Sequence, residues 1–145
     1  MNTRTLLAGL AAGVAAFLLG WLLFGILLMG YFETNTLSYE GLMKSEAEFN
    51  WMGMILSNLL TGLLLAWLLW RMGVTTLVKG LSDGFVIGLL IYGSMALYYY
   101  SMMNWYVGIT PMLVEILTNS LWMALIGGVA ASVLGTGTRA SVANA

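Results

Sequence analysis

The sequence contains no cysteine and no histidine among its 145 residues. Without cysteine the chain has no disulfide, no thiolate nucleophile and no thiolate metal ligand. Without histidine it also lacks the side chain that most often binds metals, transfers protons near neutral pH and ligates haem iron. Catalytic sequence motifs are absent too. We therefore expect no metal site, no cofactor and no enzymatic activity.

Charged side chains are scarce: they make up 8% of the chain, whereas hydrophobic residues make up 61%. A soluble domain carries about 25% charged residues, so this inventory cannot cover a water-exposed surface. A lipid bilayer must replace water around most of the chain. The net charge of −1 offers no basic surface for nucleic acid. The composition indicates an integral membrane protein.

Four segments are long and apolar enough to cross a membrane as helices, which takes about 20 residues each. They cover residues 5–29, 51–70, 81–103 and 112–134. Short connections favour antiparallel neighbours, so we predict an all-α fold with one antiparallel four-helix transmembrane domain over residues 1–134. The first apolar run is longer than the about 7–15 residues of a signal peptide, and we interpret it as an uncleaved span.

Lysine and arginine indicate the orientation, because cytoplasmic loops are enriched in them. Four basic residues fall on one side of the membrane: Arg4, Arg71, Lys79 and Arg139. Lys44 falls on the other side, within an acidic loop over residues 30–50. We expect a multi-pass protein of the bacterial inner (plasma) membrane with its N-terminus and C-terminus in the cytoplasm.

The acidic loop carries apolar residues near helical spacing, with charged residues between them: Tyr39, Leu42, Met43 and Ala47. This pattern predicts a short amphipathic helix on the outer surface. The last residues, 135–145, are small and polar, and we expect them to form a disordered tail.

A short string recurs in the second and fourth spans: residues 55–60 are ILSNLL and residues 116–121 are ILTNSL. One interpretation is chance. The other is a pair of helical hairpins with the same orientation, related by a pseudo-twofold axis along the membrane normal, as in some transporters. Under the second interpretation Asn58 and Asn119 lie at matching depths.

Asparagine in hydrocarbon is unfavourable unless it finds a partner. Asn58 and Asn119 can each bond a neighbouring helix, or they can share one polar site with Ser57, Thr118 and Glu115. Glu115 is the only acidic residue well inside a span, about one turn from the outer end of its helix. It can interact with the helix dipole at the interface, or bind a proton or cation together with Asn119.

Small residues recur at every fourth position, most regularly at Gly80, Gly84 and Gly88. Such ridges let helices approach closely in lipid. The ridge can be used inside the four-helix monomer, or it can face another subunit. At the inner end of the same span Lys79 and Asp83 are four residues apart, a spacing at which they can form an ion pair.

The first span contains AAFLLGWLLFG at residues 15–25, a polar loop follows it, and the second and third spans are joined by a glycine turn, MGVTT, at residues 72–76. In this layout the chain resembles a family of small bacterial four-helix membrane proteins whose function is unknown. The resemblance implies the same four-helix fold and supplies no site residues.

Three functions fit these observations. The first is a non-catalytic subunit or packing partner, either in a homo-oligomer or in a larger membrane complex. The second is a small transporter or channel that acts as a homo-oligomer around Asn58, Asn119 and Glu115. The third is a protein that contacts lipid or quinone, because residues 98–106 form a dense aromatic patch that can be an interfacial belt or the wall of a ligand site.

Overall fold

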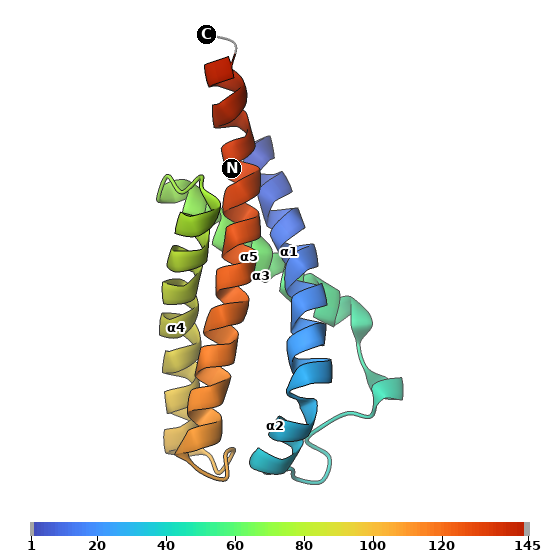
Figure 1. Ribbon diagram of the computed structural model, residues 1–145. Helices are drawn as coiled ribbons and strands as arrows, with labels where there is room; N and C mark the ends of the chain where they lie inside the picture. The colour runs from blue at the N-terminus through green and yellow to red at the C-terminus, as the bar shows by residue number, and fades with distance from the viewer. Residues whose placement is uncertain (1, 144–145) are drawn as a thin grey trace.

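A computed structural model describes residues 2–143, and its long elements are all helices. The α-helices of this range are α1 (Thr3–Leu22), α2 (Met29–Asn35), α3 (Trp51–Arg71), α4 (Leu77–Met102) and α5 (Ile109–Ala143) (Figure 1). Four helical segments have the length and hydropathy of a membrane span: Thr3–Leu27, Trp51–Arg71, Leu77–Met102 and Ile109–Thr136. The predicted all-α fold with four apolar helices able to cross a membrane is therefore confirmed.

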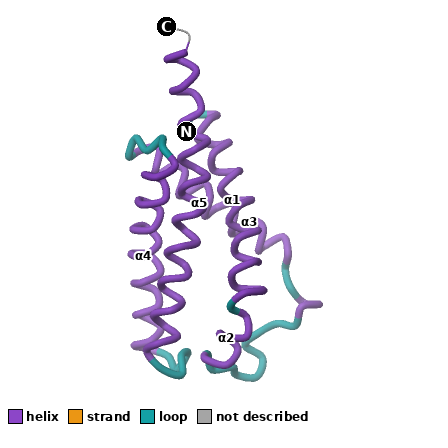
Figure 2. The backbone as a smooth tube through the Cα atoms, viewed as in Figure 1, coloured by secondary structure: helices purple, strands orange, loops and turns teal. Residues whose placement is uncertain are grey.

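The helices form two hairpins that meet along α5. Helix α1 packs against α3, α4 packs against α5, and α1 also lies on α5. Helix α5 is central, because 67% of its spanning window is buried, compared with 17–22% in the other three spans. Both chain ends lie at the same end of the molecule as the α3–α4 turn, which we name the terminal end (Figures 1 and 2). Helix α2 and the α4–α5 turn form the opposite end, which we name the loop end.

The two hairpins do not contact each other symmetrically. A twofold axis that relates them would make the α1–α5 contact equivalent to an α4–α3 contact. Helix α1 packs extensively on α5, whereas α3 and α4 touch only slightly. The paired hairpins are present, and their relation by an internal repeat stays a prediction.

Helices α4 and α5 approach closely because glycines line their contact. A Cβ atom at Gly84 would lie 2.5 Å from the carbonyl oxygen of Met123, and one at Gly80 would lie 2.5 Å from the carbonyl oxygen of Gly127. Gly88 also faces Met123. All three glycines of the ridge are thus buried against α5 within one chain, and the ridge does not face another subunit.

A second close crossing joins α1 to α3, and the sequence analysis does not identify it. Gly62 faces Gly9 and Gly13, so a side chain at position 62 would collide with the backbone of α1. Trp122 of α5 also bonds α1, because its indole N–H donates to the carbonyl oxygen of Ala16 at 2.9 Å. These contacts lie around one buried core shared by α1, α3 and α5.

The predicted amphipathic helix of the loop is wrong in position. Helix α2 lies earlier, and within the predicted stretch the structure has only a 3₁₀ turn, Glu46–Glu48, at its end. Gly41 has φ +76°, a left-handed conformation that interrupts an α-helix. The loop therefore bends at the point where the apolar spacing alone predicts a continuous helix.

Helix α5 continues through Ala143, where the sequence analysis predicts a disordered tail over residues 135–145. Gly135 is buried against the carbonyl oxygen of Thr75 in the α3–α4 turn. This contact carries the packed part of the helix beyond the predicted end of the fourth span. Residues 144–145 lie outside the described residues.

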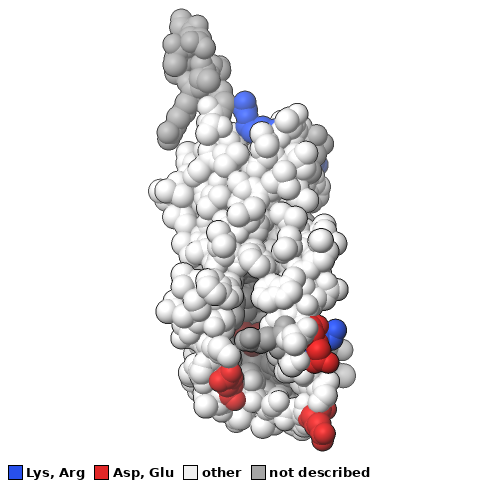
Figure 3. Space-filling view, turned by 90° about the vertical axis from the view of Figure 1, so that its right-hand side faces the viewer, with Lys and Arg blue, Asp and Glu red and all other residues white. Residues whose placement is uncertain are grey.

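Charged side chains lie toward the two ends of the molecule. Figure 3 shows the acidic groups toward the loop end, with one basic group beside them and other basic groups near the terminal end. Lys79 Nζ lies 3.7 Å from Asp83 Oδ2, so the predicted pair is present. Between the two ends the visible surface is almost free of charge, as expected for a protein that lies in hydrocarbon.

We expect Gly84→Ala to lower the free energy of unfolding by about 1–3 kcal/mol, because the new methyl group overpacks the backbone of α5. Gly93→Ala on the same helix is the matched control. A Cβ atom at Gly93 has its nearest neighbour at 3.9 Å, so this variant should match the wild type or gain up to about 1 kcal/mol. Unfolding in detergent followed by far-UV circular dichroism measures both. Equal effects of the two substitutions would contradict the glycine contact.

Candidate functional site

Helix α1 changes its geometry where it approaches the loop end. Residues Leu23–Leu27 form a π-helical turn, and Leu28, with φ −113° and ψ 3°, separates this turn from α2. A π-turn holds more residues than an α-turn and often lies at a functional site. The ring centroids of Phe24 and Phe32 are 6.0 Å apart across this junction. The junction thus places aromatic side chains of two helical segments side by side.

A groove of about 700 Å³ lies beside this junction, between α1 and α2 on one side and the start of α3 with the preceding loop on the other. Small-molecule sites have volumes of about 300–1,000 Å³. The groove opens to the surroundings, since the lining residues Trp21 and Met43 are 61% and 70% exposed. The surface in Figure 3 is hollowed on this side of the molecule, in its lower half. The groove is therefore large enough for a ligand and accessible from the side.

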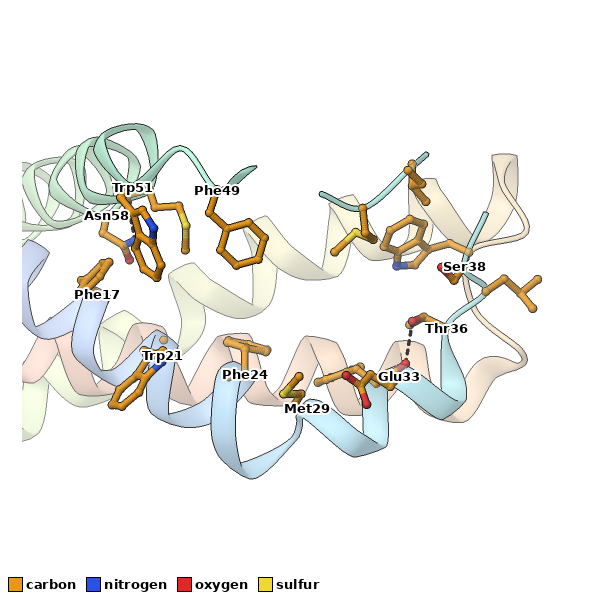
Figure 4. Close-up of a pocket in the computed structure, with 18 residues that line it drawn as sticks. Phe17, Trp21, Phe24, Met29, Glu33, Thr36, Ser38, Phe49, Trp51 and Asn58 are labelled. Atoms are coloured by element: carbon orange, nitrogen blue, oxygen red, sulfur yellow. Dashed lines mark hydrogen bonds between the residues drawn. The ribbon is translucent and has the colours of Figure 1, made fainter. Parts of the chain in front are cut away.

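Aromatic rings dominate the wall of the groove. The lining rings are those of Phe17, Trp21, Phe24, Phe32, Phe49, Trp51 and Trp105. Figure 4 shows Phe17 of α1 and Phe24 of the π-turn on the side of the groove that faces Phe49 and Trp51, whereas the Trp21 ring is turned away from them. Aromatic side chains give large apolar contact areas with few rotatable bonds. The middle of the groove is suited to an apolar chain or a flat ring.

Polar side chains lie at the two ends of the groove. Asn58 lies at one end beside Phe17, and Glu33, Thr36 and Ser38 lie at the other end (Figure 4). Rings and methionines separate these two ends. The groove therefore has a short polar end near α2, a long apolar middle and a single amide at its inner end.

The polar groups keep hydrogen-bonding capacity for a ligand. Asn58 Nδ2 donates to Met54 O at 2.8 Å, which leaves the side-chain oxygen Oδ1 of Asn58 as an acceptor. Thr36 Oγ1 donates to Phe32 O at 2.7 Å, which leaves its lone pairs. Among the side chains that the structure describes, neither the Glu33 carboxylate nor the Ser38 hydroxyl bonds another protein group. Acceptors therefore prevail at the end of the groove near α2.

Backbone hydrogen bonds fix this end of the groove to the α4–α5 turn. Thr36 and Tyr106 form an antiparallel β-bridge. In this bridge Leu37 N donates to Trp105 O at 2.8 Å, and Val107 N donates to Asn35 O at 3.1 Å. Main-chain bonds thus join the end of α2 to the lining residue Trp105, and the hydroxyl of Tyr39 adds a bond to the carbonyl oxygen of Asn104 at 3.0 Å.

Tyr106, which belongs to this bridge, is only 7% exposed. Among the groups that the structure describes, its hydroxyl has no hydrogen-bond partner. Burial raises the pKa of Tyr106, and the nearby carboxylate of Glu115 raises it further. A buried phenol without a standard partner is unusual, and Glu115 on α5 is the group that faces it. Neither residue lines the groove.

The described hydrogen bonds of the predicted polar residues stay within single helices. Asn58 lines the groove, whereas its neighbour Ser57 does not. On α5 the buried Asn119 donates from Nδ2 to Glu115 O at 3.0 Å, and the hydroxyl of Thr118 donates to Val114 O at 2.8 Å. Each bond stays within its own helix. No described hydrogen bond joins the two asparagines, and their sharing of one polar site stays a prediction.

Most of the residues that wall the groove were not predicted from the sequence as a site. Of the aromatic patch over residues 98–106 only Trp105 lines it. The other wall residues have a signal that the sequence does show: Phe17, Trp21 and Phe24 are spaced by four and three residues and so share one helix face.

Comparison of the chain with protein-family models, with curated proteins and with solved structures gave no match. The resemblance to a family of small four-helix membrane proteins stays a prediction.

Tyr106 generates a prediction at alkaline pH. Because its pKa is higher in the folded chain than the usual value of 10.0, the unfolded chain releases the proton first as pH rises. Stability that is present below pH 10 is then lost above it. We expect the melting temperature of Tyr106→Phe to fall less steeply above this pH than that of the wild type. Tyr98→Phe, at an exposed residue of α4, is the control for loss of a hydroxyl. Identical slopes for the wild type and Tyr106→Phe would refute this assignment.

Proposed function

We propose that the protein is a non-catalytic membrane protein that holds the apolar part of a lipid-like amphiphile in the groove between α1 and α3. The observation that carries this proposal is a groove of about 700 Å³ that the described residues wall with aromatic rings. An apolar groove beside hydrocarbon takes up apolar groups, because they supply dispersion contacts to its lining atoms. The molecules nearest to such a groove are membrane lipids.

The distribution of polar groups supports an amphiphile over a wholly apolar molecule. Glu33, Thr36 and Ser38 are gathered at the end of the groove near α2. A molecule with one polar head and an apolar chain satisfies both parts at once, the head beside α2 and the chain along the rings. Ligand sites commonly combine an apolar wall with a few placed polar groups in this way.

The transporter alternative is less well supported. It depends on Asn58, Asn119 and Glu115 lining one site, and only Asn58 lines the groove, whereas Asn119 bonds Glu115 on α5. Helix α5 also fills the centre of the bundle with buried side chains. The geometry supports a lateral groove better than a central path.

We propose that the loop end faces the outside of a bacterial inner membrane and that both chain ends face the cytoplasm. The support is the distribution of basic residues, which are enriched on the cytoplasmic side. Arg4, Arg71 and Lys79 belong to the terminal end, whereas Lys44 belongs to the loop. With this orientation the groove lies in the outer half of the bilayer.

The absence of native cysteine gives a direct test of orientation. We expect Ser38→Cys in the loop to react with a membrane-impermeant maleimide in intact cells. Thr76→Cys, an exposed position at the start of α4, should react only after the membrane is opened. The reverse pattern would show that the groove lies in the inner half of the bilayer.

A second candidate function is that of a packing partner in a homo-oligomer or a larger membrane complex. The observation that favours it is the small-residue stripe at the start of α3. Gly53 and Ser57 are exposed, in contrast to the buried glycines of α4. Small-residue stripes allow another transmembrane helix to approach closely. This function is compatible with a bound lipid, because Ser57 does not line the groove.

Two neighbouring residues of α3 give a matched test of the groove. Met54 lines it and Ile55 does not, and both side chains are 41% exposed. We expect Met54→Trp to fill part of the groove and lower the lipid retained after purification by about threefold or more, a loss of roughly 0.7 kcal/mol. Ile55→Trp adds the same ring outside the groove and should retain lipid as the wild type does.

Native mass spectrometry in mild detergent measures both quantities. The mass added to each chain gives the retained lipid, and the mass of the assembly gives the number of chains. A wild-type protein that retains no lipid, or equal losses in the two variants, would refute the proposed function. A stable dimer or a foreign subunit would support the second candidate.

A further inference from the structure

The charge at the polar end of the groove is one-sided. Glu33 is the only charged residue among those that line the groove in the described part of the chain. Its carboxylate has no ion-pair partner there, and two hydroxyl-bearing residues, Thr36 and Ser38, line the same end (Figure 4). The described lining contains no lysine or arginine. The end that would receive the polar head therefore presents an anion and hydrogen-bond acceptors.

The loop around this end is acidic as a whole. Residues 30–50 contain four glutamates and one lysine. A field of one sign attracts groups of the opposite sign and repels like charge. An anionic head would meet the Glu33 carboxylate without a basic residue in the wall. A neutral head would gain nothing from the charge. A head that carries an ammonium group would satisfy the carboxylate and donate several hydrogen bonds.

We infer that the groove is selective for a membrane lipid whose headgroup carries a primary amine, such as phosphatidylethanolamine, and that Glu33 binds this amine. The inference rests on the proposed function and adds the chemistry of the head. The ammonium group lies at Glu33, with Thr36 as a further acceptor, and the acyl chain lies along the rings toward Asn58.

The strength of the selectivity is limited by solvent. Glu33 is exposed, so water screens its interaction with an ammonium group. We therefore expect a preference of about two- to fivefold for the amine head, with most of the affinity supplied by the apolar part. Glu33 would select among lipids without being needed for lipid binding itself.

The test is a competition between lipids that share their acyl chains. The full-length protein, stripped of lipid by detergent exchange, is incubated with equal amounts of phosphatidylethanolamine, phosphatidylglycerol and diacylglycerol. Native mass spectrometry then gives the ratio of the bound species. We expect the wild type to favour phosphatidylethanolamine, and Glu33→Gln to bind the three lipids nearly equally while the total bound lipid stays the same. Glu40→Gln, which removes an exposed glutamate of the same loop outside the groove, should keep the wild-type ratio.

The outcomes separate this inference from the proposed function. Bound lipid without a preference, a preference for phosphatidylglycerol, or an unchanged ratio in Glu33→Gln would overturn the amine assignment and leave the lipid groove standing. Binding of no lipid by the wild type, or undiminished binding by Met54→Trp, would overturn the proposed function and the inference with it. Loss of selectivity in Glu40→Gln to the same degree would show a diffuse effect of loop charge and would also overturn the role of Glu33.

Discussion

The close approach of helices through small residues is the constraint on which the rest of this structure depends. In a bilayer no hydrophobic drive holds helices together, because lipid chains are as apolar as leucine. Packing contacts must supply the attraction, and they require backbones to come near. Gly62 of α3 against Gly9 and Gly13 of α1 provides one such contact, and the glycines of α4 against α5 provide the other.

The groove follows from where the small residues stop. Along α1 the buried positions up to Ala16 are small, and from Phe17 onward the same side of the helix carries aromatic rings. Helix α3 runs the opposite way, and its buried residues begin only at Gly62. Two antiparallel helices with this gradient close at the terminal end and separate at the loop end. Asn58 lies where the two helices begin to separate, and its backbone carbonyl oxygen is 3.2 Å from a Cβ atom placed at Gly13.

The sequence predicts the parts of this fold that depend on composition and on spacing along one helix. The four apolar spans, the Lys79–Asp83 pair and the closely packed side of α4 are of this kind. The groove is not, because it depends on the angle between two helices that are far apart in the sequence. Depth along a helix likewise places Asn58 and Asn119 at matching levels, but it does not give the direction in which each side chain points. The loop differs from its prediction because Gly41 has a positive φ, and this backbone conformation interrupts the helix that the apolar spacing predicts.

The two ends of the groove differ in how they are held, and this difference bears on selectivity. The inner end at Asn58 is fixed by the packing of α1 on α3. The outer end is fixed by main-chain bonds between α2 and the α4–α5 turn, which include Leu37 N to Trp105 O. The hydroxyl of Tyr39 adds a bond to the carbonyl oxygen of Asn104, whereas no described bond of the Glu33 carboxylate joins the two segments. Recognition of a polar head by Glu33 is therefore separate from the bonds that hold this end of the wall. An outer end that is already tied in place lowers the ordering cost of binding, so that a modest charge contact is sufficient to distinguish one head from another.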